Sequence, residues 1–117
     1  MKIERNVGIP AAAYAGAPDL DIELAWLQES TRTPGFELSR KFWLRRAAFL
    51  DRLALREAGS YGLEATVPLI RTAEMAGSGL VVYDIAHSGL SPKGSDLVVG
   101  EDHRAYVREE YRASSLG

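Results

Sequence analysis

The segment from Lys41 to Arg56 constrains the fold of this chain most, because it combines a wide apolar arc with a separate row of cations. It reads KFWLRRAAFLDRLALR. At about 100° per residue, one side of a helix here would carry mostly large apolar side chains. These are Phe42, Trp43, Ala47, Phe49, Leu50, Leu53 and Ala54. Such an arc must pack against other parts of the protein, so this helix is predicted to be the spine of the core.

The length of 117 residues suits a single domain with one hydrophobic core. Apolar residues make up 46% of the chain and charged residues 26%, as in globular rather than disordered proteins. The net charge of −2 supplies no general attraction for nucleic acid or anionic lipid. Binding of either would therefore need a local basic patch.

The chain contains no cysteine, which excludes disulfides, thiolate metal sites and thiol nucleophiles, and which fits a reducing cytosol. The N-terminal residues lack the pattern of a signal peptide, and no stretch approaches the ~20 apolar residues of a membrane span. We therefore expect a cytoplasmic protein that has no cofactor and does not associate with a membrane.

The first thirty residues divide into two parts. Residues 1–18 are rich in Ala, Gly and Pro without a sustained period, which indicates a flexible N-terminal arm with Tyr14 as a local anchor. Residues 19–30 alternate as a strand does but also fit a helical period. Their composition, with Asp19 available as an N-cap, favours a helix.

Two further helices are predicted from periodicity and capping signals. The spine helix should cover residues 39–58, with Ser39 as N-cap and Gly59 in a left-handed conformation at its end. Residues 63–87 favour a second helix, although Gly77-Ser78-Gly79 weakens its middle and residues 79–87 alternatively fit a strand. One side of it would carry Leu69, Ile70, Ala73, Ala76, Leu80 and either Tyr83 or Asp84.

The last part of the chain predicts a surface loop at residues 88–100, with a possible short extended piece at 97–99, and then a terminal helix at 101–113. Residues 114–117 should fray. The whole pattern predicts an all-α domain over residues 19–113, made of three to four short helices. A central helical hairpin is expected, with the C-terminal helix packed across it.

Two segments carry a resemblance to a known group: WLRRAAFLDRLALRE at residues 43–57 and HRAYVREEYRA at 103–113. Together they resemble small actinobacterial hypothetical proteins with a Trp-Leu-Arg-rich first helix and a closing Arg-x-Tyr-Val-Arg-x-Glu-Tyr helix. The resemblance covers about residues 40–113. Because that group has no assigned activity, it implies a shared helical scaffold and a bacterial cytoplasmic setting, and no reaction.

The cations of the spine helix offer one candidate site. A row of basic side chains can neutralise phosphates of DNA or RNA, and this row consists of Lys41, Arg45, Arg52 and Arg56. The simpler interpretation is a solvated face whose arginines pair with Asp51, with Glu57 and with the acidic residues between Asp19 and Glu29. Arg46 instead projects into the apolar arc, so a structural pair with a carboxylate is expected for it.

The terminal helix offers a second candidate site, a protein-contact face, because arginine and tyrosine are enriched at the energetic centres of interfaces. Its residues are Arg104, Tyr106, Arg108, Tyr111 and Arg112. Pairing among its own charges on a solvated helix would explain the same pattern. The aromatic residues Trp26, Phe42, Trp43 and Phe49 are assigned to core packing rather than to a ligand pocket.

The two histidines raise a third possibility, a metal-dependent enzyme. Asp84 and His87 lie one helical turn apart, and Asp102 and His103 lie across the predicted loop. Each pair is also typical of a capped helix end, and the chain has no nucleophile elbow or phosphate-binding loop. We therefore predict no catalytic and no metal-ligating residue.

These observations predict a small non-enzymatic protein-interaction or regulatory module that forms a homodimer or docks on another protein. The alternative is an accessory protein that binds DNA or RNA through the basic face of the spine helix.

Overall fold

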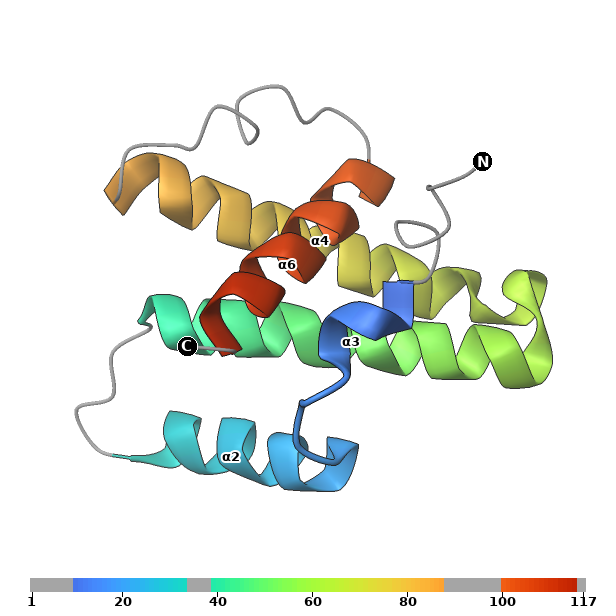
Figure 1. The fold of residues 1–117 in the computed structure, drawn as a ribbon, viewed down its shortest axis with the longest axis horizontal. Helices are drawn as coiled ribbons and strands as arrows, with labels where there is room; N and C mark the ends of the chain where they lie inside the picture. Colours follow the sequence, from blue (N-terminus) through green and yellow to red (C-terminus); the bar gives the residue numbers. More distant parts are fainter. Residues whose placement is uncertain (1–9, 34–38, 88–99, 116–117) are drawn as a thin grey trace.

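The computed structural model describes residues 10–33, 39–87 and 100–115, apart from the side chain of Ser115. These residues form a short 3-10 helix and four α-helices: η1 (Pro10–Tyr14), α2 (Leu20–Arg32), α3 (Arg40–Tyr61), α4 (Leu63–His87) and α6 (Gly100–Ser115). Helices α3 and α4 form an antiparallel hairpin, α2 lies along the other side of α3, and α6 crosses the hairpin (Figure 1). The predicted all-α fold with its central hairpin is therefore confirmed.

Helix α3 begins where the sequence predicts and ends three residues later than predicted. The Ser39 hydroxyl accepts a hydrogen bond from the backbone N–H of Phe42 at 3.2 Å, as an N-cap does. The predicted stop at Gly59 is wrong, because the helix continues to Tyr61. Gly62, with a φ of 88°, makes the turn instead, and its N–H donates to the carbonyl of Ala58.

The buried residues of α3 only partly match the predicted arc. Phe42, Ala47 and Ala54 of that arc are buried, but so are Leu44, Ala48 and Asp51, which lie outside it. Ala47, Ala48 and Ala54 are almost fully buried, together with Asp51. Small side chains on this line let α4 and α6 approach α3 closely. The larger apolar residues Trp43, Phe49, Leu50 and Leu53 are only half-buried.

Helix α4 is continuous through its glycines, so the helical interpretation of residues 79–87 is confirmed and the strand alternative is wrong. Leu80 is fully buried, and Asp84 rather than Tyr83 faces inward. A Cβ built on Gly77 would lie 2.9 Å from the carbonyl oxygen of His103, a close approach that only glycine permits. Gly77 therefore sets the distance between α4 and α6.

We expect Gly77→Ala to destabilise the protein by about 1–3 kcal/mol, because the new methyl group would push the backbones of α4 and α6 apart. Gly59→Ala is the matched control. A Cβ on Gly59 would meet nothing within 4 Å, so this helical substitution should stabilise the protein by about 0.5–1 kcal/mol. Urea unfolding followed by circular dichroism measures both changes. A shift of the same sign in both variants would contradict this account of Gly77.

The segment before α3 is helical, as its composition favours, and the strand alternative for residues 19–30 is wrong. Asp19 occupies the N-cap position of α2, although its side chain makes no capping hydrogen bond. Residues 10–14 differ from the loose lead-in expected there, because they form η1 and contact α3 and α6. Tyr14 is the buried anchor of this segment.

The predicted loop and its extended piece at 97–99 lie outside the described residues, apart from Gly100, which begins α6. Residues 114 and 115, which were expected to fray, belong to α6. None of the described helices is both long enough and apolar enough to cross a membrane.

Candidate functional site

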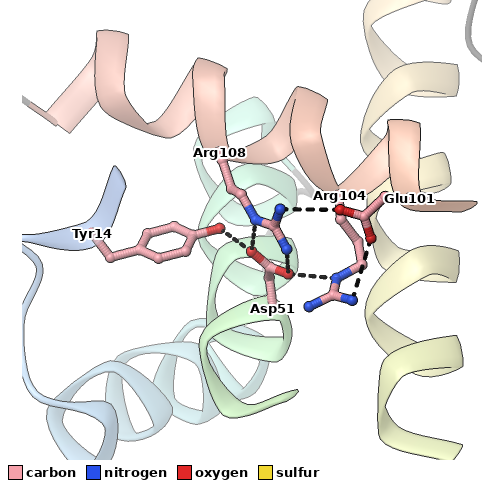
Figure 2. A network of polar contacts seen from close by, with 5 residues as sticks. All are labelled: Tyr14, Asp51, Glu101, Arg104 and Arg108. Carbon is pink, nitrogen blue, oxygen red and sulfur yellow. Dashed lines mark hydrogen bonds and ion pairs between the residues drawn. The ribbon is translucent and has the colours of Figure 1, made fainter. Parts of the chain in front are cut away.

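A fully buried carboxylate at Asp51 organises the centre of the molecule (Figure 2). Arg108 donates to both of its oxygens at 2.7 and 2.9 Å, and the Nε of Arg104 donates to Oδ1 at 2.6 Å. The hydroxyl of Tyr14 donates to Oδ2 at 2.6 Å. Glu101 lies 3.3 Å from Arg108 and 3.6 Å from Arg104, adding a second negative charge. The cluster therefore joins η1, α3 and α6 through one carboxylate.

The donors around Asp51 control its ionisation. Burial raises the pKa of the Asp51 carboxyl, but hydrogen bonds from Arg108, Tyr14 and Arg104 outweigh it, so the pKa lies below its ordinary value. Burial and the neighbouring carboxylate both raise the pKa of the Tyr14 hydroxyl, which keeps its proton. Because four hydrogen bonds saturate the carboxylate, its arrangement suits a structural clamp rather than a proton-transfer group.

A second buried carboxylate, Asp84 on α4, repeats the same arrangement. Arg40 donates to its two oxygens at 2.7 and 2.8 Å, and the Tyr106 hydroxyl donates at 2.6 Å. Burial raises the pKa of the Asp84 carboxyl, but the hydrogen bonds from Arg40 and Tyr106 lower it by more. The pKa therefore lies below its ordinary value. Arg40 also donates to Glu110 at 2.8 Å. This cluster joins the start of α3 and the last turn of α4 to the middle of α6.

A third buried carboxylate, Glu23 on α2, receives two hydrogen bonds from Arg45 at 2.7 and 2.8 Å. The guanidinium of Arg45 also lies 3.8 Å from the centre of the Trp26 ring, within the range of a cation–π contact. Arg45 therefore fastens α2 to α3.

The basic row predicted on α3 faces α2 and is largely used within the chain. Besides Arg45, Arg52 donates to the carbonyl of Pro18 at 2.6 Å, and Arg56 pairs with Glu57 at 3.2 Å. Lys41 is exposed, lies 5.6 Å from the Trp26 ring and forms no ion pair with a described carboxylate. The expected partner Asp51 is bound by the arginines of α6 instead. Nucleic-acid binding by this row stays a prediction.

The predicted contact face of the terminal helix is turned mostly inward. Arg104, Tyr106 and Tyr111 are buried, and Arg108 is half-buried against Asp51. Only Arg112 among these five is exposed. Four of these residues therefore contribute to packing α6 against the rest of the protein, and a partner-binding role for this face stays a prediction.

The four residues of the metal hypothesis do not converge. His87 stacks on Tyr83 at 4.0 Å at the exposed end of α4, while His103 lies against Gly77, about 15 Å earlier along that helix. Asp84 is held by Arg40 and Tyr106. Across residues 10–33, 39–87 and 100–115, no three His, Asp or Glu side chains form a group that could hold a metal ion.

Sequence reasoning placed the buried charge at Arg46 and missed Asp51. Arg46 is half-buried and forms no ion pair with a carboxylate in the described ranges. The signal for Asp51 lies in its helical neighbours, because Ala47, Ala48 and Ala54 share its side of the helix. A carboxylate in the middle of an alanine line faces the core, and it then requires cationic partners.

The outer face of α4 is the largest concentration of exposed apolar side chains in the described structure. Met75, Val82 and Ile85 are 73%, 61% and 51% exposed, and Val67 lies on the same side. Tyr61 and Leu63 continue it at the turn between α3 and α4. A helix that is apolar on both sides is usually covered on both sides. We define the outer face of α4 as Val67, Arg71, Met75, Ser78, Val82 and Ile85.

Comparisons with protein-family models, with curated proteins and with solved structures find no match to this chain. The resemblance to actinobacterial proteins therefore stays a prediction, and the functional proposal depends mainly on the geometry.

Proposed function

We propose that this chain is a small non-enzymatic interaction or regulatory module that forms a homodimer through the outer face of α4. The observation that carries the proposal is the exposure of Met75, Val82 and Ile85 on a helix whose opposite side is already buried. Charged residues are depleted at the centres of protein interfaces, and Arg71 is the only charged residue among the six that define this face. A bacterial cytoplasmic setting is proposed with it, because the chain has no cysteine and resembles actinobacterial proteins.

A second copy is the proposed occupant because the part of the outer face from Val67 to Val82 can pair with itself. Val67 lies eight residues before Met75, and Val82 lies seven residues after it. An antiparallel pair of α4 helices that cross near Met75 therefore brings Val67 against the partner subunit's Val82. The same register places Arg71 opposite the partner subunit's Ser78, whose hydroxyl can accept its hydrogen bond. A two-fold axis near Met75 satisfies both pairings, as an isologous dimer requires.

The size of this face limits the expected affinity. From Val67 to Ile85 it is about 27 Å long and one helix wide, which is smaller than a standard interface between stable partners. We therefore expect dissociation constants on the order of tens of micromolar rather than nanomolar.

A single engineered cysteine tests the register, since the chain has no cysteine of its own. We expect Met75→Cys to form a disulfide-linked dimer under mild oxidation, because the two sulfurs would meet beside the axis. Val82→Cys alone should not form this dimer, since its two copies would be about 22 Å apart. Mixing Val67→Cys with Val82→Cys should give the crosslinked pair. Non-reducing gel electrophoresis measures all three.

Ile22→Cys on α2 is the control for random collision, because Ile22 is 59% exposed but lies on a different helix. Equal crosslinking of Met75→Cys and Ile22→Cys would refute the proposed interface. Sedimentation equilibrium adds an independent test, in which Met75→Lys should weaken the dimer of the unmodified chain. Only monomer at high micromolar concentration would also refute it.

A further inference from the structure

A pocket of about 470 Å³ lies away from the outer face of α4, between the first turn of α3, the end of α6 and Pro18. Its walls combine apolar surface from Pro18, Leu44 and Tyr111 with three cationic side chains. The cations are Arg40, Lys41 and Arg45, and no acidic side chain among the described residues lines it. Its volume is in the range of small-molecule binding pockets.

Two of the three cations are already neutralised. Arg40 is paired with Asp84 and Glu110, and Arg45 is paired with Glu23. Lys41 has no carboxylate partner within the described part of the chain. It also belongs to the first turn of α3, where the helix dipole favours a negative charge. Lys41 is therefore the pocket cation that is open to a bound anion.

Tyr111 supplies a second and independent indication of a ligand. Its side chain is only 6% exposed and its ring packs edge-on against Tyr14 at 5.2 Å. No hydrogen bond joins its hydroxyl to any described residue, although its backbone carbonyl accepts one from Ser114. Buried hydroxyl groups almost always have a hydrogen-bond partner. A pocket-lining hydroxyl that lacks one within the protein is available to a bound molecule.

We propose that this pocket binds a small amphipathic carboxylate, with its negative group against Lys41 and Tyr111 and its apolar part on Leu44 and Pro18. A carboxylate can pair with Lys41 and can accept a hydrogen bond from the tyrosine hydroxyl. A phosphate dianion would need further free donors and would leave the apolar walls unused. This site is independent of the dimer proposed above, because its residues do not include the outer face of α4.

Isothermal titration of the full chain with hexanoate, with hexanamide and with inorganic phosphate tests the ligand class. Hexanoate should bind with saturation below about 10 mM, and the neutral amide should bind about tenfold or more weakly because it lacks the charge. Inorganic phosphate should bind more weakly than hexanoate. If phosphate bound more tightly than hexanoate, the pocket would be a simple anion site. If hexanamide bound as tightly as hexanoate, it would be an apolar site. If hexanoate binding did not saturate, the pocket would not be a binding site. Each of these three results overturns the proposal.

Two conservative variants test the residues. Lys41→Gln and Tyr111→Phe should each weaken hexanoate binding about tenfold, since each removes one contact to the carboxylate and leaves the packing in place. Arg56→Gln, at the far end of the same cationic row, and Tyr61→Phe, at the exposed turn, are the matched controls and should bind as the unmodified chain does. Circular dichroism checks that all four variants fold. Unchanged affinity in both Lys41→Gln and Tyr111→Phe would overturn the proposal.

Discussion

Replacing Asp51 by asparagine is expected to destabilise the fold by about 3–5 kcal/mol, because it leaves Arg104 and Arg108 with only the exposed Glu101 as a counter-ion. Asp51 has no exposed surface, and Arg104 and Arg108 both donate to it. An amide cannot neutralise them, and its NH₂ group would face donors instead of acceptors. A loss of this size is a large part of the 5–15 kcal/mol that stabilises a typical domain.

Urea unfolding followed by circular dichroism measures the effect, and Glu57→Gln is the control. Glu57 pairs with Arg56 at a largely exposed site, where ion pairs contribute about 0–1 kcal/mol. Tyr14→Phe should fall between the two, because it removes one hydrogen bond to the carboxylate and leaves both charge pairs. A stability of Asp51→Asn within about 1 kcal/mol of the unmodified chain would contradict the central role of this carboxylate.

The second large effect is a steep loss of stability in acid. The folded-state pKa values of Asp51 and Asp84 are lowered from an ordinary value of 3.8. Below pH 3.8, each of these two carboxyls is protonated in the unfolded chain but is still ionised in the folded chain. The contribution of these two carboxylates to the free energy of unfolding is therefore complete above their pKa in the unfolded chain. It is lost as the pH falls through their lower pKa values in the folded chain. The two groups together should contribute a slope of about 2.7 kcal/mol per pH unit in this window.

Unfolding free energies between pH 2 and 6, measured at low ionic strength, test this slope. Asp84→Asn should reduce the slope by about 1.4 kcal/mol per pH unit, because one proton is no longer taken up on unfolding. Asp21→Asn, which removes an exposed aspartate of α2, should leave the slope unchanged. If Asp84→Asn and Asp21→Asn had the same slope, the buried pair between Arg40 and Asp84 would not control the acid response.

Local signals in the sequence account for most of the secondary structure. The period of residues 41–56 and the N-cap at Ser39 locate the start of α3, and composition decides for a helix at residues 19–30. These features act within a few residues of each other, so they are visible in one chain. The end of α3 was missed because Gly59 and Gly62 are both plausible stops, and only the packing of the hairpin selects the second.

The candidate sites were much less predictable, because they depend on contacts between distant parts of the chain. The arginines and tyrosines of α6 are predicted to contact a partner protein, yet three of the five are buried and Arg108 is half-buried. The spacing of these residues along the helix would be the same whether they contacted a partner protein or the core of their own chain. Whether a tyrosine faces a partner or its own core depends on where α3 and α4 lie, and the helix itself does not carry that information.

The sequence by itself determined that this chain forms an all-α domain built on one amphipathic spine, since periodicity and capping are local properties of the backbone. Only the tertiary structure decided which charges are buried. Asp51 is satisfied by Tyr14, 37 residues before it, and by Arg104, 53 residues after it. A carboxylate can leave water only where such donors converge, and that convergence exists only after the helices have packed.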